Sequence, residues 1–163
     1  MFWHNRSERG FTLIEILVVL AIVGVVCALA VVRLESSESR RVAQEAQRIA
    51  TLLEAARDEA IASGHSVAVS SDGQGVQFWL ANDEQGEWLA FPAHETLQAR
   101  RLAGGVTWQG QRVNERARPL GERLVFPPDG VVEPFEVTLE AGAIQVALEM
   151  DVMGRVGVRD ATP

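Results

Sequence analysis

The stretch that decides the fold is Arg9–Glu15, with the sequence RGFTLIE, where a short polar leader gives way to a long apolar segment. Apart from Glu15, this segment contains no charged residue until Arg33. A carboxylate inside an apolar segment of membrane length is costly, so its presence there indicates a function. Glu15 also lies one helical turn beyond Phe11, which would become the amino terminus after a cut behind Gly10.

The apolar segment Phe11–Val32 is long enough to cross a lipid bilayer as a helix. It has 22 residues, of which 15 are Phe, Leu, Ile or Val, and would span about 33 Å. Those side chains favour insertion by about 5–9 kcal/mol, whereas one acid at the centre costs about 2.5–3.5 kcal/mol. We therefore predict a membrane helix. Arginines flank it on both sides, so the positive charges leave its orientation open.

Residues 33–63 are expected to continue the same helix. No Gly or Pro interrupts Val25–Ser63, and Gly64 is a typical residue at a helix end. Six apolar residues recur at spacings of four and three, which places them on one helix face: Val42, Ala46, Ile49, Leu53, Ala56 and Ala60. This face either packs on the chain's own sheet or forms a seam between subunits, where its alanines would permit close approach.

After Gly64 the pattern changes to short strands. Alternating residues around the turn 72–75 predict a hairpin, and the polar stretch Gln109–Glu122 is expected to be an exposed loop. Further strands are expected near residues 88–91, 106–108, 124–126, 135–139, 144–150 and 155–159. The sequence predicts an α+β fold in which one long N-terminal helix packs on a mostly antiparallel β-sheet. The domains are a leader (1–10), a transmembrane helix (11–32), its amphipathic continuation (33–63) and a β-sheet domain (64–163).

The composition argues against several classes of protein. The net charge is −7 and all 15 basic residues are Arg, so the chain is a poor partner for a nucleic-acid backbone. The single cysteine, Cys27, cannot form an intrachain disulfide. The three histidines are not at metal-ligand spacing, and no Gly-rich turn or Ser fits a phosphate-binding loop or a nucleophile elbow. We expect no metal, no cofactor and no enzymatic activity.

The hexapeptide Gly10–Glu15 resembles the processing site of type IV pilins and type II secretion pseudopilins. In those proteins a membrane aspartyl peptidase, the prepilin peptidase, cuts after the glycine and methylates the new amine. The resemblance implies cleavage between Gly10 and Phe11 and N-methylation of Phe11. Because the peptidase acts at the cytoplasmic face, it also implies a single-pass inner-membrane protein whose C-terminal domain is periplasmic.

The rest of the chain is similar to the H-type minor pseudopilins (GspH) and the related FimT-like minor pilins. The similarity rests on four stretches: Arg41–Ser63, Ser66–Ser70, Leu124–Gly130 and Met153–Val158. It implies a pilin-like fold and a structural subunit near the tip of a periplasmic pseudopilus in protein secretion. The implied partners are the major pseudopilin, other minor pseudopilins and the inner-membrane assembly platform, with the secretin or secreted cargo as further candidates.

Glu15 is our candidate for the residue that sets the register between subunits during assembly. Cleavage would leave a positive amine on Phe11, at a helix N-terminus that already carries partial positive charge. Inside an apolar bundle Glu15 needs a cation, and the Phe11 amine of a neighbouring subunit would supply it. Loss of one member of such a buried pair costs about 3–5 kcal/mol. The alternative is that Glu15 merely lies at the level of the lipid headgroups.

Two other classes compete with a pseudopilin. An ordinary secretory signal could be cleaved after Ala30, but Glu15 within the apolar segment argues against it. A lipoprotein signal could be cleaved before Cys27, but the preceding Val26 is too bulky for such a site. A FimT-like minor type IV pilin, active in pilus assembly or DNA uptake, would share the leader and the fold. Its basic surface would have to be Arg100 and Arg101 or the stretch Arg112–Arg118, with Trp108 nearby for base stacking. The loops Asn82–Glu87 and Gln109–Glu122 are candidate partner contacts.

Overall fold

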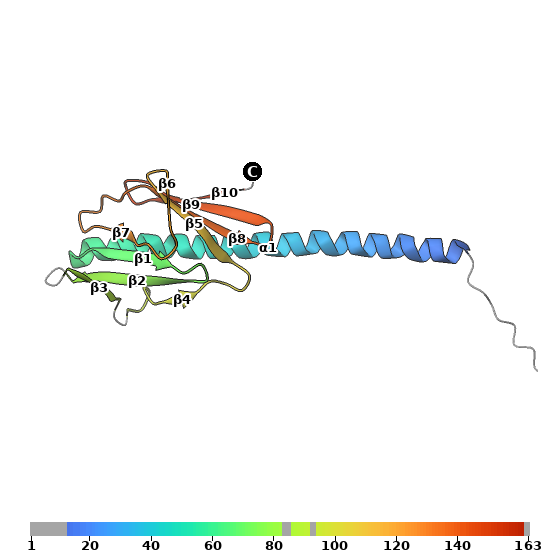
Figure 1. Cartoon of the computed structure of the whole chain (residues 1–163), viewed down its shortest axis with the longest axis horizontal. Coiled ribbons are helices and arrows are strands. Elements are labelled where there is room, and N and C mark those ends of the chain that lie inside the picture. Colours follow the sequence, from blue (N-terminus) through green and yellow to red (C-terminus); the bar gives the residue numbers. More distant parts are fainter. Residues whose placement is uncertain (1–12, 83–85, 92–93, 162–163) are drawn as a thin grey trace, which may run out of the picture. The chain divides into compact units, whose positions relative to one another are not determined.

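The computed structural model describes residues 13–82, 86–91 and 94–161, with the backbone alone at residues 29–36. The chain divides into two compact units, Met1–Ser36 and Ser37–Pro163. Helix α1, Leu13–Ser63, contributes its first part to one unit and its second part to the other. All the strands belong to the second unit (Figure 1). The expected start of the helix at Phe11 lies outside the described residues.

The second part of α1 forms because its apolar residues recur at helical spacing and are then buried by the strands. Its amphipathic face is 0–1% exposed at all six positions: Val42, Ala46, Ile49, Leu53, Ala56 and Ala60. The helix ends at Gly64, as expected, because glycine adopts the left-handed conformation at little cost. Gly64 has a φ of +73°, and its N–H donates to the Ala60 carbonyl at 3.1 Å.

Five strands form the first sheet, which we call sheet A. Their order is β3-β2-β1-β7, and β4 pairs with one end of β2. All pairs are antiparallel. The bounds are β1 Val67–Ser71, β2 Gly75–Asn82, β3 Glu87–Ala90, β4 Arg100–Arg101 and β7 Leu124–Phe126. The predicted hairpin is β1 and β2, and its turn is closed by the Asp72 carboxylate, which accepts the N–H groups of Gln74 and Gly75.

The other five strands form sheet B, in the order β10-β9-β8-β5-β6. These pairs are also antiparallel. The bounds are β5 Thr107–Val113, β6 Arg116–Arg118, β8 Phe135–Ala141, β9 Ile144–Met150 and β10 Val156–Asp160. The strict alternation of buried and half-buried residues along β8 is typical of a strand with one face in a core.

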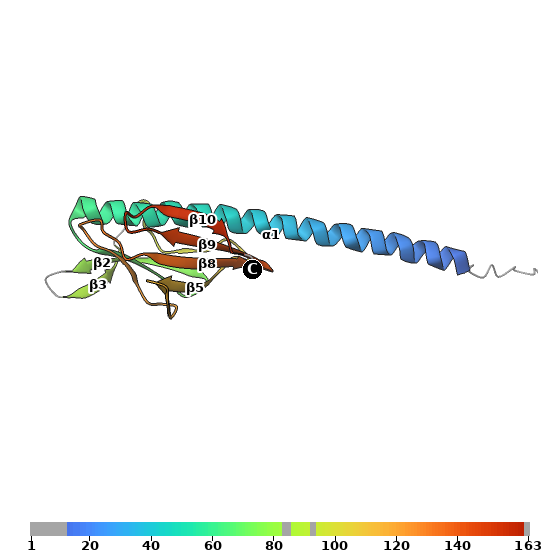
Figure 2. The same cartoon turned by 90° about the horizontal axis from the view of Figure 1, so that it is seen from above.

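One hydrophobic core joins the two sheets to the second part of α1. Figure 2 shows this part of the helix running alongside strands β8, β9 and β10. Its largest fully buried side chains include Trp108, Phe78, Phe126, Ile49 and Leu53. The predicted α+β class with an antiparallel sheet is confirmed. The division of the strands into two sheets was not predicted.

The prediction of an exposed loop over Gln109–Glu122 is wrong, because most of this stretch is a hairpin made of β5 and β6. Its turn residues, Asn114 and Glu115, both have positive φ, as a tight hairpin turn requires. Two features of β5 interrupt the alternation of apolar and polar residues by which a strand is predicted from sequence. The register shifts between Trp108 and Gly110, and the inward-facing Gln111 is polar although only 3% exposed.

Candidate functional site

The predicted processing site, Gly10 and Phe11, lies outside the described residues, as does the rest of the leader. Glu15 is described. It lies in the first turn of α1, where an acidic side chain is favoured by the helix dipole, and its side chain is exposed. Of the predicted processing and assembly residues, the structure therefore describes Glu15, whose exposed carboxylate lies in the first turn of α1.

Around Glu15, the first part of α1 exposes large apolar side chains. The exposed fraction is 84% for Leu13 and 49–70% for the others: Ile14, Ile16, Leu17, Val18, Val19, Leu20, Ile22, Val23, Val25 and Val26. Within the described residues, no helix has both the length and the apolar character needed to span a membrane.

The six residues of the amphipathic face pack within the second unit. Their burial leaves them no surface to present to another subunit, so the suggested intersubunit seam does not lie at these positions.

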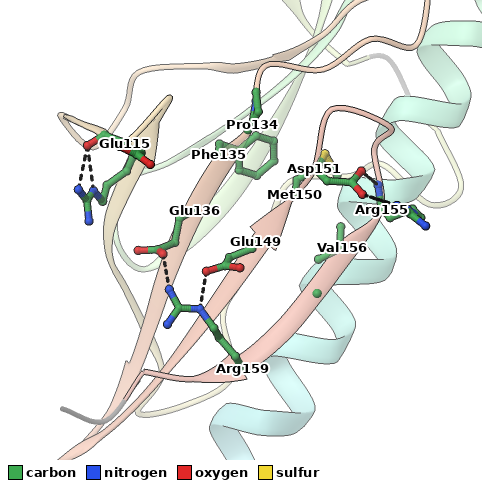
Figure 3. A pocket seen from close by; sticks show the side chains of 12 residues that line it. Glu115, Pro134, Phe135, Glu136, Glu149, Met150, Asp151, Arg155, Val156 and Arg159 are labelled. Carbon is green, nitrogen blue, oxygen red and sulfur yellow. Dashed lines mark hydrogen bonds and ion pairs between the residues drawn. The ribbon is translucent and has the colours of Figure 1, made fainter.

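A groove of about 750 Å³ lies on sheet B, and several charged side chains line it (Figure 3). Arg159 of β10 reaches across β9 and pairs with Glu136 of β8, Nη2 to Oε2, at 2.7 Å. Its Nε also donates to Glu149 of β9. The hydrogen bond that Arg159 donates to the Glu149 carboxylate is the main reason that the pKa of Arg159 is raised. Three neighbouring strands are thus tied together by one guanidinium.

Two further arginines of the groove also donate to acceptors within the chain. Arg155 donates to Asp151 at 2.9 Å, and Arg112 donates to the Glu115 carbonyl at 2.8 Å. The backbone N–H of Arg155 lowers the pKa of the Asp151 carboxyl. The described lining contains no His, Cys, Ser or Lys, and no three metal-ligating side chains gather anywhere in the described ranges.

The basic stretches proposed for nucleic-acid binding do not form a binding surface with Trp108. That ring is only 1% exposed, so it cannot stack on a base. Arg100 donates to the Thr96 carbonyl at 2.8 Å, and Arg118 pairs with Glu122 at 3.1 Å. These arginines hold the local backbone and side chains of their own domain.

Sequence reasoning missed a cluster on sheet A that consists of Trp79, Trp88 and Arg123. The guanidinium carbon of Arg123 lies 4.4 Å from the ring centroid of Trp79 and 5.6 Å from that of Trp88. Both distances are typical of cation–π contacts. Trp79 and Trp88 lie on the consecutive strands β2 and β3, but Arg123 is distant in sequence, and the antiparallel pairing of sheet A brings it to them.

Comparison with known proteins gives the family. Residues 45–154 match the family described as Type II transport protein GspH, which covers most of the second unit. The chain belongs to this family. Residues 5–31 match the Prokaryotic N-terminal methylation motif. The resemblance drawn from the sequence is therefore confirmed at both ends of the chain.

Three GspH-like or pilin-like proteins illustrate the range of relatives. The type II secretion system protein H of Aeromonas hydrophila is 26% identical over 83% of this chain and 82% of its own. The type II secretion system protein H of Pseudomonas aeruginosa is 34% identical over 52% of this chain. The matched region spans about half of that relative's length, 49%. The pilin-like protein PilA1 of Thermus thermophilus is 31% identical over 82% of this chain and 85% of its own.

Solved structures share the GspH fold. The minor pseudopilin EpsH of Vibrio cholerae superposes with a TM-score of 0.60 at 18% identity, over 76% of this chain and 99% of that one. The type IV minor pilin FimU of Pseudomonas aeruginosa gives a TM-score of 0.51 at 16% identity, over 76% of this chain and 91% of that one. These identities are low, so the two structures support the pilin-like fold and nothing more specific.

Proposed function

We propose that this chain is a minor pseudopilin, a structural subunit near the tip of the periplasmic pseudopilus of a type II protein secretion system. The observation that carries the proposal is that a GspH-family domain and an N-terminal methylation motif occur in one chain. The ion pairs that Arg155 and Arg159 make with acidic residues of the sheet B groove support a structural role.

In this proposal the prepilin peptidase removes residues 1–10 at the cytoplasmic face and methylates the amine of Phe11. Residues 11–32 anchor the protein in the inner membrane, and the remainder lies in the periplasm. The exposed apolar side chains of the first unit support this arrangement, because such a surface needs lipid or other helices around it. Neighbouring pseudopilins and the assembly platform would supply those helices once the subunit leaves the membrane.

Glu15 then acts in assembly. Its exposed position in the first turn of α1 leaves the carboxylate accessible to the methylated amine of a neighbouring subunit. A charge pair enclosed by apolar side chains fixes the relative height of two helices, because a shift would leave both charges buried and unpaired.

The test is complementation in the bacterium that encodes the chain. Deletion of the gene should abolish export of the secreted enzymes, and the full-length chain should restore it. The mature chain should also be recovered in sheared or cross-linked pseudopili in amounts far below those of the major pseudopilin. Normal export without the chain would contradict the proposal.

A minor type IV pilin is the second candidate, favoured by the similarity to PilA1. In that case the deletion strain would lose surface pili or DNA uptake and would still export its enzymes. The burial of Trp108 and the net charge of −7 weigh against direct DNA binding. A salt-dependent shift of DNA by the purified chain would reverse this preference.

A further inference from the structure

The outer face of sheet A carries a row of side chains that crosses four strands. The pairing places Ala68 of β1 opposite both Val125 of β7 and Trp79 of β2, and Trp79 opposite Ala90 of β3. Neighbours along a strand point to opposite faces, and Val69 and Phe78 are buried in the core. The row therefore faces away from the core, and Val125 in it is 40% exposed.

Arg123 lies over this row and is held by the two indole rings already described. Trp79 is itself fixed, because its Nε1 donates to the Ser70 hydroxyl at 2.8 Å. Among the described residues, no carboxylate or carbonyl accepts a hydrogen bond from the Arg123 guanidinium. The side chain is exposed, so a guanidinium with available N–H donors is held in place beside two indole rings.

A cavity of about 580 Å³ adjoins the cluster on the same face. Ser70 and Trp79 line one side of it, and Arg100 and Arg101 of β4 line another. The cavity offers room for a side chain of a bound molecule beside Trp79. Its two arginines outnumber the one acid of its lining, Asp72, so the balance of charge there is positive.

We propose that the face formed by Trp79, Trp88, Arg123 and Val125 docks a protein segment that presents an Asp or Glu carboxylate beside apolar side chains. A guanidinium binds a carboxylate through two parallel N–H bonds, and the cation–π contacts leave those in-plane donors available. Trp and Arg together are also the residues that most often dominate binding energy at protein interfaces.

The occupant is a protein and not a nucleic acid, because a chain with a net charge of −7 repels a polyanion but tolerates a single carboxylate at a local positive site. The inference rests on the proposed function in one respect: a pseudopilus subunit has protein neighbours in the periplasm. The cluster then identifies the surface and the chemistry of one such neighbour.

The experiment uses the full-length chain in its own bacterium, with p-benzoylphenylalanine in place of Val125. After irradiation, the cross-linked peptide is identified by mass spectrometry. The same photoreactive residue at Val158, which is similarly exposed on β10 at 42%, is the positional control. Arg123→Glu, Arg123→Lys and Arg116→Glu are each combined with the Val125 probe, and Arg116→Glu makes the same change of charge on sheet B.

We expect the Val125 probe to capture a protein peptide in which an Asp or Glu adjoins apolar residues. Its yield should fall about tenfold in Arg123→Glu, in line with the loss of a hydrogen bond to a charged group. It should fall less in Arg123→Lys and stay unchanged in Arg116→Glu. A yield that Arg123→Glu leaves unchanged, a peptide without an acid, or capture of only lipid, nucleic acid or nothing would overturn the proposal.

Failure of this inference is distinguishable from failure of the proposed function. If export and incorporation into pseudopili persist while Val125 captures no acidic segment, the chain is a pseudopilin that uses another surface. If export never depended on the chain, the proposed function fails whatever Val125 captures.

Discussion

Arg57 of α1 lies directly against Gly154, in the turn between β9 and β10, and leaves no room for a side chain there. The Arg57 guanidinium also donates to the Gly130 carbonyl at 3.3 Å. One helical residue thus fixes two turns that are separate in sequence. Gly154 has a φ of +74°, so both its backbone and its surroundings demand glycine.

Gly154→Ala should therefore destabilise the protein by about 1–3 kcal/mol, through left-handed strain and displacement of Arg57. The measurement is urea unfolding of the full chain in detergent, followed by tryptophan fluorescence. Gly104→Ala is the matched control, because an added Cβ there meets no atom within 4 Å. Equal unfolding midpoints for the two variants would contradict the packing described here.

Ile49→Ala should cost about 2–5 kcal/mol, the usual range for removing a large aliphatic side chain from a core. Ile49 is 1% exposed in this single chain, whereas Ile61 on the same helix is 45% exposed. Ile61→Ala should therefore cost much less in the same urea experiment. If Ile49→Ala reduced pseudopilus assembly and left stability unchanged, the face of α1 would be an intersubunit seam after all.

Acid should destabilise the second unit in part through Asp151. Its carboxylate accepts the N–H groups of Arg155 and Met153, and its pKa is lowered chiefly by the first of these. The unfolded chain lacks these bonds. The ionised carboxylate therefore stabilises the fold above its ordinary pKa of about 4, and this contribution is lost as the pH falls through the lower folded value.

Asp151→Asn should accordingly reduce the loss of stability seen between about pH 5 and about pH 2. Urea midpoints measured across that range provide the check. Asp160→Asn, on the adjoining strand β10, is the control, because no described backbone N–H donates to its carboxylate. A steeper or unchanged acid dependence in Asp151→Asn would show that the turn does not favour the ionised form.

Glu15→Ala should block incorporation of the mature chain into pseudopili while cleavage continues. Loss of one partner of a buried charge pair costs about 3–5 kcal/mol, enough to remove most of the subunit from the filament. Immunoblots of sheared pseudopili and membranes give the ratio of assembled to unassembled chain. Glu95→Gln, which removes an exposed loop charge, should assemble normally. Normal assembly of Glu15→Ala would end the proposed role in register.

Periodicity was sufficient to predict the helix up to Ser63 and its inward face, because burial and helical spacing agree at Val42, Ile49 and Leu53. The stop at Gly64 and the hairpin around Asp72 followed from residues with strong local preferences. The continuation of strand β5 beyond Trp108 was missed because a bulge and the buried Gln111 break its alternation. Gln111 is kept inside by donating to the Pro119 and Glu122 carbonyls, partners that no local pattern reveals.

The candidate sites also differ in whether they could be predicted from the sequence. The processing motif is a run of adjacent residues, so it could be identified from the sequence. The Trp79, Trp88 and Arg123 cluster depends on the pairing of β2 with β3 and of β1 with β7. The Arg159 pairs with Glu136 and Glu149 depend on the order of three strands in sheet B. Neither could be foreseen without the topology of the sheets.

The mature N-terminus tests the account most directly. The full-length chain is expressed in its own bacterium, isolated from membranes, and its intact mass and N-terminal peptide are determined by mass spectrometry. We expect a polypeptide that begins with N-methylated Phe11 and contains no residue of the leader. A mature chain that begins at Met1, at Cys27 or after Ala30 would contradict it.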